Sequence, residues 1–257
     1  MTTIGQRVRG RGGDRGRYVA AAIPVAADRV LDVGCAYGWA LGGLRQPGRA
    51  LVGVDPDAAA LRAARASYPD VTFVRGGADR LPFDHDSFDA AIFSDVIGLL
   101  SDEQMRRAVD EVHRVLRPGG AFAFTGPHAG LLAWSDPHDF KRRFPGVYKL
   151  YMRASGHAPA TRLEAGYRHL RMSRYEALLG GRFDMRDVRF CGMFTGPLTW
   201  LLVAGSRLRL MPARAQAAVN RFRGWENGLR YPRPLAYNVW IVATKRAAAT
   251  PSAGSRS

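Results

Sequence analysis

Short apolar runs recur along the first half of the chain, and each is followed by a stretch that favours a turn or a helix. Continuous runs rich in β-branched residues are typical of parallel strands that are buried on both faces. The runs span residues 30–33, 51–54, 71–75, 88–93 and 121–125. Their alternation with helix-forming stretches predicts an α/β fold whose strands lie in one mostly parallel sheet.

Two further apolar runs predict a sixth and a seventh strand, at 183–191 and 237–244. Helices are predicted at 18–27, before the first strand, and at 173–180, before the sixth. Another helix is predicted to begin at Ser101, which has acids in the turn after it. Its apolar positions form a stripe that we expect to be buried, namely Val109, Val112, Val115 and Leu116.

The stretch from Arg29 to Asp57 carries the most informative chemistry. Its first strand is followed by a turn between Gly34 and Gly38, and its second strand ends on Asp55. Such a turn lets backbone N–H groups and a helix N-terminus face a ligand, and an acid after the next strand accepts hydrogen bonds from ribose hydroxyls. The order of strand, glycine turn, helix, strand and acid therefore indicates a nucleotide-binding sheet.

The sequence of this strand and turn, VLDVGCAYG, resembles motif I of class I S-adenosylmethionine (SAM)-dependent methyltransferases, usually written VLDVGCGxG. The resemblance implies a Rossmann-like, doubly wound sheet of seven strands whose last strand runs antiparallel at or near the sheet edge. It also implies that Asp32 holds the methionine end of SAM and that Asp55 binds its ribose. Ala36 stands where the family usually has glycine, and if that backbone needs a positive φ, alanine costs about 1 kcal/mol.

Later segments also resemble signatures of this family. The segment 79–83, DRLPF, resembles D-x-LPF, in which the acid lies by the adenine amino group. The stretch 86–95 resembles FDxVxxxxV and places Ser94 and Asp95 near the transferred methyl; the alternative for Asp95 is a helix N-cap. The stretch 111–124 resembles the family's helix–L(K/R)PGG–strand unit. The cofactor-binding residues implied are Asp32, Gly34, Ala36, Gly38, Asp55, Pro56, Asp79, Arg80, Ser94 and Asp95.

His128 follows the fifth strand and is a candidate general base, because a histidine at the carboxyl end of a strand can take a proton from an acceptor. The alternative is a loop histidine or a substrate contact. An aromatic and basic insert at about 129–172 is predicted to cover the site as a lid. Its candidate substrate contacts are His138, Tyr148 and His169. No metal site is predicted, because no Cys/His spacing supports zinc.

A second lid insert is expected at about 193–233, after the sixth strand. Its apolar part, 193–211, is interrupted by glycines and a proline, which argues against a bilayer span. Three interpretations stay open for this part: a lid helix packed on the sheet, a peripheral contact with a membrane surface, or a dimer interface.

Composition and charge narrow the classes of partner. The chain has 257 residues and a net charge of +16, but all but three of its 38 basic residues are arginine. With abundant alanine and glycine, this favours the residue bias of a GC-rich genome over a nucleic-acid partner. The fourth strand is followed by the sequence SDVI instead of Asn/Asp-Pro-Pro-Tyr, which argues against methylation of adenine or of a glutamine amide.

The ends of the chain are expected to lie outside the domain, which spans 18–246. Residues 1–17 are Gly/Arg-rich and predict a flexible basic arm, and residues 247–257 predict a disordered tail. The arm has no apolar core, so no secretory signal is expected. With only two cysteines, the expected location is the reducing cytoplasm, with a peripheral position at the inner membrane face as the alternative.

The resemblance implies a SAM-dependent methyltransferase that acts on a small-molecule or lipid-linked acceptor. The favoured reaction is O-methylation of a sugar, a lipid-linked glycan or a secondary metabolite. C-methylation of a quinone-like lipid is the first alternative and suits the apolar second insert. Nucleic-acid binding or RNA methylation, through the Arg-rich arm, is the second.

Overall fold

The computed structural model describes residues 13–135, 144–146, 168–191 and 232–246, and single positions between 212 and 229. At its centre is one seven-stranded sheet with the order β3-β2-β1-β4-β5-β7-β6. The strands are β1 (Arg29–Val33), β2 (Ala50–Asp55), β3 (Thr72–Arg75), β4 (Phe88–Ser94), β5 (Leu116–Pro127), β6 (Phe183–Cys191) and β7 (Asn238–Lys245). β1 to β5 run parallel, and β7 is antiparallel to both of its neighbours. The predicted fold class is confirmed, with the last strand one position from the sheet edge.

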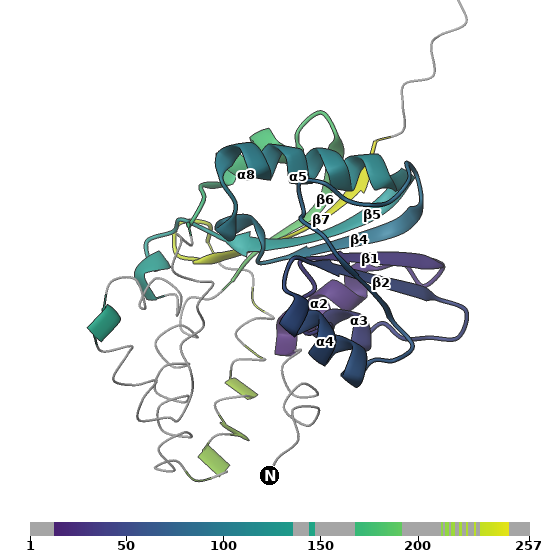
Figure 1. Cartoon of the computed structure of the whole chain (residues 1–257). Coiled ribbons are helices and arrows are strands. Elements are labelled where there is room, and N and C mark those ends of the chain that lie inside the picture. Colours follow the sequence, from purple (N-terminus) through teal and green to yellow (C-terminus); the bar gives the residue numbers. More distant parts are fainter. Residues whose placement is uncertain are drawn as a thin grey trace, which may run out of the picture.

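Helices cover both faces of the sheet, as Figure 1 shows. One face carries α2 (Gly13–Ala22), α3 (Trp39–Gly42) and α4 (Ala58–Ser67). The other carries α5 (Asp102–Val115) and α8 (Met172–Leu179). Two 3₁₀ turns, η1 (Ile97–Leu99) and η2 (Ala133–Ser135), follow β4 and β5. We refer to the two sides as the α2–α4 face and the α5–α8 face.

Side chains alternate between these two faces along each strand. Leu31, Phe93 and Phe124 belong to the core under α5 and α8, whereas Val30 and Ile92 belong to the core under α2, α3 and α4. The alternation therefore assigns each polar residue near the strand ends to one face or the other.

The start of α5 agrees with the prediction. Ser101 Oγ accepts from the N–H of Gln104 at 3.2 Å, and Gln104 Oε1 accepts from the N–H of Ser101 at 3.0 Å. This reciprocal pair is a capping box, which satisfies two N–H groups that would otherwise lack partners. The predicted stripe is buried at all of its positions, but only Val109, Val112 and Val115 lie on α5, because Leu116 is the first residue of β5.

The structure corrects the predicted bounds of two elements. α2 spans Gly13–Ala22 instead of the predicted 18–27, so the helix begins within the Gly/Arg-rich stretch and ends earlier than predicted. β5 begins at Leu116, ahead of its predicted start, because Leu116 pairs with Phe88 of β4. Gly119 takes a φ of 76°, which lets the chain pass through an irregularity in the strand instead of ending it.

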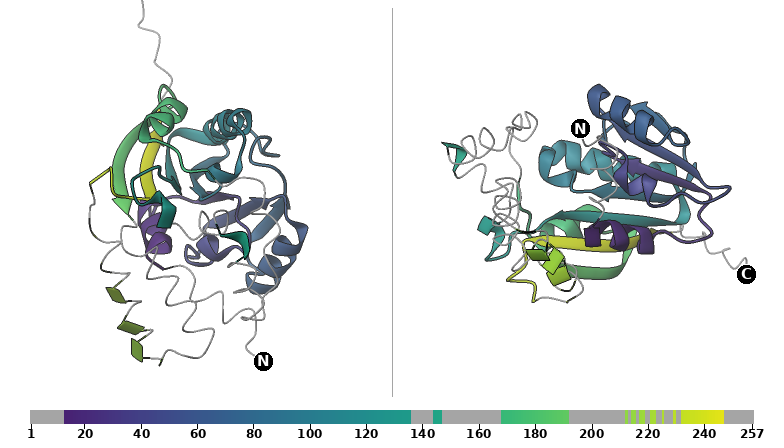
Figure 2. Two further views of the ribbon diagram at one scale, coloured as in Figure 1. Left: turned by 90° about the vertical axis from the view of Figure 1, so that its left-hand side faces the viewer. Right: turned by 90° about the horizontal axis from the view of Figure 1, so that it is seen from below.

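The parallel strands end on one side of the molecule, which the left view of Figure 2 faces. In open α/β sheets, ligands bind just outside the carboxyl ends of the strands. The loops at 34–38, 56–57, 76–87 and 95–96 leave β1, β2, β3 and β4 on this side. Among the described residues no helix is both long and apolar enough to cross a membrane.

Candidate functional site

The loop after β1 is a tight turn with left-handed backbone at three positions. Gly34, Ala36 and Gly38 have φ values of 76°, 45° and 72°. The N–H of Gly34 donates to the carbonyl of Val54 at 2.7 Å, which ties the turn to β2. A Cβ on Gly34 would lie 2.3 Å from Cγ2 of Val96, so the turn also packs against the loop after β4. Glycine is therefore required at position 34 by its φ and by this close approach.

Ala36 meets the condition under which the sequence predicted strain. Its φ of 45° lies in the left-handed region, where a Cβ crowds the following carbonyl. The N–H of Ala36 donates to Oδ2 of Asp55 at 3.1 Å, which helps to hold the residue in this conformation. The cost of about 1 kcal/mol therefore falls where the loop meets the acid of the next strand.

The carboxylate of Asp55 joins the loops after β1 and β2. Its Oδ2 accepts from Ala36, and its Oδ1 accepts from the N–H of Asp57 at 2.7 Å. Asp57 in turn caps α4, because its Oδ1 accepts from the N–H of Ala59 at 2.9 Å. A carboxylate oxygen has two lone pairs, so the group that holds both loops can also accept hydrogen bonds from the hydroxyls of a ligand.

Asp32 lies at the end of β1 on the α2–α4 face and is 3% exposed. Burial, followed by the nearby charge of Asp55, raises the pKa of the Asp32 carboxyl to about 7. A buried carboxyl that lies beside a second acid is stabilised in its charged form by a positive charge placed next to it. Asp32 and Asp55 therefore suit a ligand that presents a cation close to a pair of hydroxyls. Burial also raises the pKa of the adjacent Cys35 thiol, which stays protonated.

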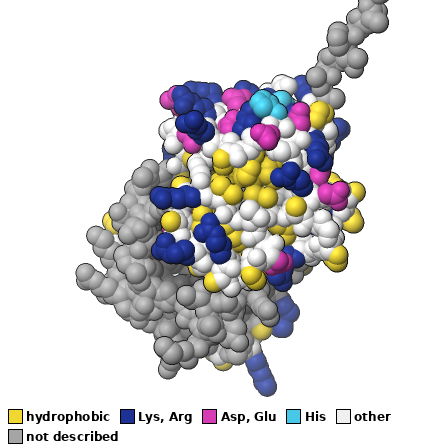
Figure 3. All heavy atoms as spheres, turned by 45° about the vertical axis from the view of Figure 1, so that its right-hand side comes forward, with side chains coloured by type: hydrophobic (Ala, Val, Ile, Leu, Met, Phe, Trp, Pro, Cys, Tyr) yellow, Lys and Arg dark blue, Asp and Glu magenta, His cyan; other side chains and the backbone are white. Residues whose placement is uncertain are grey.

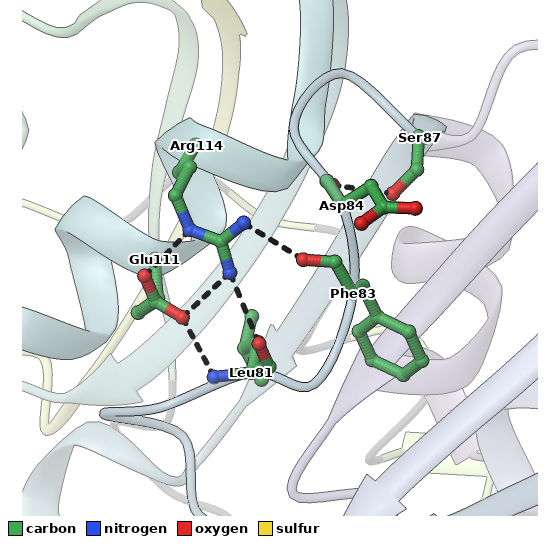
Figure 4. A network of polar contacts seen from close by, with 6 residues as sticks. All are labelled: Leu81, Phe83, Asp84, Ser87, Glu111 and Arg114. Carbon is green, nitrogen blue, oxygen red and sulfur yellow. Dashed lines mark hydrogen bonds and ion pairs between the residues drawn. The ribbon is translucent and has the colours of Figure 1, made fainter.

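The loop after β3 is held by two charged residues of α5, as Figure 4 shows. Arg114 donates from Nε and Nη2 to the two carboxylate oxygens of Glu111, at 2.7 and 2.8 Å. It also donates to the carbonyls of Phe83 and Leu81, at 2.7 and 3.0 Å. The N–H of Leu81 donates to Oε2 of Glu111 at 2.7 Å. We refer to Glu111 and Arg114 as the clamp, because the pair fixes the loop backbone on both sides of Pro82.

Neither residue of the clamp was predicted to be functional. A glutamate and an arginine three positions apart on a helix resemble an ordinary surface ion pair. Here the two side chains are only 20% and 23% exposed. The hydrogen bond from Arg114 is the main cause that lowers the pKa of Glu111, so the pair is ionised near neutral pH. The only sequence signal was the Glu-x-x-Arg spacing beside the buried stripe.

The other predicted residues of these loops lie at the same side of the sheet. Asp79 and Arg80 form a tight turn just before the segment that the clamp holds. In this turn the N–H of Arg80 donates to the carbonyl of Gly77 at 3.4 Å. Asp79 is half-buried and Arg80 is exposed. Pro56 is also exposed, and its carbonyl accepts from Nε of Arg75 at 3.3 Å. The structure thus brings Asp79 to the same strand ends as Asp32 and leaves Arg80 facing solvent.

Ser94 and Asp95 end β4 beside Thr125 of β5. The hydroxyl oxygens of Ser94 and Thr125 lie 3.0 Å apart. Asp95 Oδ1 accepts from Oγ1 of Thr125 at 3.3 Å, and the N–H of Asp95 donates to the carbonyl of Thr125 at 3.0 Å. Asp95 has a φ of 56°, and the N-cap of η1 is Val96, so the N-cap alternative for Asp95 is wrong. Strained non-glycine residues of this kind gather at functional sites.

His128 follows the carboxyl end of β5 but lies on the opposite face of the sheet from Asp32. It is 3% exposed, and its Nε2 lies 3.1 Å from the carbonyl oxygen of Arg233, so the ring proton is on Nε2. Burial lowers the pKa of His128, which leaves a neutral ring with its lone pair on Nδ1. The ring lies 5.0 Å from that of Phe190, which packs on the core of the α5–α8 face. The structure therefore does not bring His128 together with Asp32 and Ser94.

The predicted substrate contacts divide into two groups. His169 is half-buried and precedes Leu170, which forms a β-bridge with His128, so His169 lies near the end of β5. His138 and Tyr148, like the apolar part of the second insert, lie outside the described residues. Within the described ranges, no three His, Cys, Asp or Glu side chains are grouped to hold a metal ion.

On the face that Figure 3 shows, the basic charge of the described residues is spread over the surface. In Figure 3, Lys and Arg side chains are scattered among acidic ones, around a central group of apolar side chains. Several arginines form ion pairs, for example Arg45 with Asp70 at 3.1 Å and Arg246 with Asp184 at 2.7 Å. The face in this view therefore carries no continuous basic stripe of the kind that follows a nucleic-acid backbone.

Comparisons with known proteins agree with this geometry. Residues 30–120 match a family described as "Methyltransferase domain". The chain is 39% identical over 136 residues to the demethylmenaquinone methyltransferase of Clavibacter sepedonicus, covering 51% of this chain and 55% of the relative. It is 34% identical over 124 residues to the phthiotriol/phenolphthiotriol dimycocerosates methyltransferase of Mycobacterium tuberculosis, covering 45% and 44%.

A similar solved structure is the complex between the Trm112 methyltransferase activator of Haloferax volcanii and a putative methyltransferase. The TM-score is 0.61 at 17% identity, and the match covers 96% of this chain and 94% of that one. At this identity the likeness supports the fold alone. The chain spans about half the length of the curated relatives it matches. The matched stretch contains motif I, Asp55 and the clamp.

Proposed function

We propose that the chain carries a class I SAM-dependent methyltransferase domain and transfers a methyl group from SAM to a hydroxyl oxygen of a small, partly apolar acceptor. The observation that carries this proposal is the buried pair of Asp32 and Asp55 beside the left-handed turn at 34–38. A cationic ligand with vicinal hydroxyls satisfies both carboxyls at once, and SAM is such a ligand.

Three positions hold SAM in this proposal. Asp32 attracts the positively charged methionine end, and Asp55 accepts from the ribose hydroxyls. Asp79 accepts from the adenine amino group, while the buried side chain of Leu81, whose backbone the clamp holds, lies at the same loop. SAM supplies a methyl group that is already electrophilic on its sulfonium, so the protein mainly aligns the acceptor and excludes water.

Large apolar side chains at the carboxyl ends of the strands support an acceptor with an apolar part. Tyr37, Leu99, Leu131 and Trp134 follow β1, β4 and β5, and their side chains are 47%, 45%, 72% and 53% exposed. Apolar side chains left exposed beside a site favour an apolar ligand or surface. Two of the relatives are named for quinone and lipid acceptors, which agrees with this class. Contact of residues 193–211 with a membrane stays a prediction.

Two residues are candidates for taking the acceptor proton. His128 has a neutral ring with a lone pair on Nδ1, but burial lowers its pKa and it lies toward the α5–α8 face. Asp95 lies in the turn that packs against Gly34 through Val96, close to the cofactor loop. Replacing the base lowers turnover about 100-fold or more without changing the affinity for S-adenosylhomocysteine (SAH). His128→Ala and Asp95→Asn should therefore be compared in turnover across pH, and unchanged turnover removes the role from that residue.

The proposed function is tested by incubating the protein with methyl-labelled SAM and a panel of acceptors. The panel contains a long-chain diol, a hydroquinone with an isoprenoid tail and a simple sugar. We expect a mass gain of one methyl group in an apolar hydroxyl compound, with the label on oxygen. Label on ring carbon supports the second candidate, C-methylation of a quinone-like lipid, which the named relative favours. Failure of the purified protein to bind either SAM or SAH contradicts both.

A further inference from the structure

A row of residues in register crosses the sheet on the α2–α4 face, beyond the residues that hold the cofactor. Ser94 of β4 pairs with Thr125 of β5, and Thr125 pairs with Trp240 of β7. Asn238 stands two positions before Trp240 on the same strand, so both side chains lie on one face of the sheet. β7 runs antiparallel, so its start lies beside the carboxyl end of β5. Asn238 and Trp240 therefore lie on the same face of the sheet as Ser94, near the carboxyl ends of β4 and β5.

Each of these two β7 residues buries a polar atom that has no hydrogen-bond partner among the described residues. Asn238 is 6% exposed and its Oδ1 lacks a donor, while Trp240 is 4% exposed and its Nε1–H lacks an acceptor. An unpaired buried group of this kind costs about 1–3 kcal/mol. The two atoms are complementary, because one accepts and the other donates.

The Trp240 ring is held by its neighbours rather than free to turn toward a partner. The ring of Tyr18, from α2, lies 5.0 Å away. The guanidinium of Arg189 lies over the Tyr18 ring at 5.2 Å, and its Nε donates to Oδ2 of Asp187 at 2.7 Å. Arg189 is also the β6 partner of Trp240 in register. A partner for the Trp240 N–H therefore has to be brought to it.

We propose that Asn238 and Trp240 form a subsite that binds a hydroxyl group of the methyl acceptor, an inference that rests on the proposed methyltransferase function. A hydroxyl oxygen accepts from Nε1–H of Trp240, and its proton is donated to Oδ1 of Asn238. An ether or a ketone satisfies only Trp240, and an ammonium group satisfies only Asn238. The subsite therefore selects alcohols and phenols over their methyl ethers.

The proposal is tested by following the indole N–H resonance of Trp240 in the ¹⁵N-labelled full chain, assigned by its absence in Trp240→Phe. Phenol is the probe, and anisole is its matched control, since it has the same ring and an oxygen that cannot donate. We expect phenol to shift the Trp240 resonance in a saturable way, while anisole shifts it much less. The indoles of Trp39 and Trp225, which the proposed acceptor site does not include, serve as internal controls.

Asn238→Leu should weaken phenol binding about five- to tenfold, since one hydrogen bond is lost. Thr244→Val, at the other end of the same strand, is the matched control and should leave phenol binding unchanged. Trp240→Phe keeps a ring beside Tyr18 and should also weaken binding, measured by calorimetry. Three outcomes overturn the subsite: no shift with phenol, equal shifts with phenol and anisole, or an indole that contacts a permanently bound water in their presence.

SAH binding is measured in the same samples to separate the two proposals. If SAH binds while phenol leaves Trp240 unaffected, the hydroxyl subsite is wrong and the methyltransferase function stands. If SAH does not bind, the proposed function is wrong whatever phenol does. Variants of Asn238 should bind SAH as the wild type does, because the residue lies outside the cofactor loops.

Discussion

The β1–β2 half of the carboxyl side and the β5–β7 half treat their buried polar groups in opposite ways. In the first half, both oxygens of Asp55 accept from backbone N–H groups of the chain itself. In the second half, Asn238 and Trp240 each bury a polar atom that no described residue pairs. The first half is thus built before any ligand binds, whereas the second has hydrogen bonds left to make.

This difference suits the two partners that the proposed reaction requires. A cofactor of constant shape is best held by a site whose backbone is already fixed, because little ordering is left for binding to achieve. An acceptor is recognised by the polar groups that it alone satisfies, since an analogue without the hydroxyl leaves them unpaired. Substitutions at Asp55, Glu111, Asp32 and Ala36 test this difference.

Replacing Asp55 should remove the hydrogen bonds that hold the loops after β1 and β2 together. In Asp55→Ala the N–H groups of Ala36 and Asp57 lose a charged acceptor, and we expect SAH affinity to fall about 100-fold or more. Calorimetric titration with SAH measures this. The control is Asp57→Ala, which removes the cap of α4, costs about 1 kcal/mol of stability and should leave SAH affinity nearly unchanged. Equal losses in both variants would show that only folding was damaged.

Opening the clamp should loosen the loop after β3 without touching β1 or β2. Glu111→Ala leaves the N–H of Leu81 without its acceptor, and we expect SAH to bind about tenfold more weakly. Glu103→Ala is the control, because Glu103 forms an exposed pair with Arg107 on the same helix and should change stability by less than about 0.5 kcal/mol. An unaltered SAH affinity in Glu111→Ala would exclude this loop from the cofactor site.

The pKa of Glu111 also predicts a dependence of stability on pH. Arg114 lowers this pKa in the folded protein, so the clamp's contribution is present above the ordinary glutamate range and is lost as the pH falls through the lowered value. Denaturant unfolding at a series of acidic pH values should show a smaller decline for Glu111→Ala than for the wild type.

The raised pKa of Asp32 should make cofactor binding depend on pH near neutrality. A cationic ligand favours the ionised carboxylate, and with a pKa of about 7 the ionised fraction rises about tenfold between pH 6 and pH 8. SAM affinity should therefore tighten about tenfold over that range, as measured by calorimetry. In the absence of ligand, ionisation of this group opposes folding, so its contribution to stability is lost as the pH rises toward 7. Asp32→Asn should bind weakly with a flat pH profile.

The smallest expected effect is a gain in stability. Ala36→Gly removes the Cβ from a residue with a φ of 45°, so the midpoint of thermal unfolding should rise by a few degrees, equivalent to about 1 kcal/mol. Ala59→Gly, at an exposed position in the first turn of α4, should lose about 0.5–1 kcal/mol instead. A loss of stability in both variants would contradict the left-handed conformation of Ala36.

The β1–β2 half could be predicted from sequence because its polar residues are close neighbours in the chain. The apolar runs identify β1 and β2, and the glycines and acids follow each run directly, so the turn at Gly34 and the strand ends at Asp32 and Asp55 lie where the sequence predicts them. Their role in binding the cofactor stays a prediction. The extent of β6 was also predicted correctly, since its apolar run is bounded by glycines on both sides.

The rest depends on contacts between distant residues. The clamp joins Glu111 to Leu81 across 30 positions, and no local sequence pattern near either residue predicts this contact. Likewise, Asn238 and Trp240 read as ordinary members of a strand until the register places them beside Pro127 and Thr125. Local patterns therefore predict what the backbone does, and tertiary pairing decides which polar groups are left for a ligand.

One spectrum tests the contrast between the two halves most directly: the backbone and indole N–H resonances of the labelled protein with saturating SAH. We predict large shifts for Gly34, Ala36, Gly38 and Asp57, while the indole of Trp240 stays in place until a hydroxyl compound is added. An unchanged spectrum, or shifts at Trp240 with none at residues 34–38, would contradict the assignment of the cofactor to the β1–β2 half.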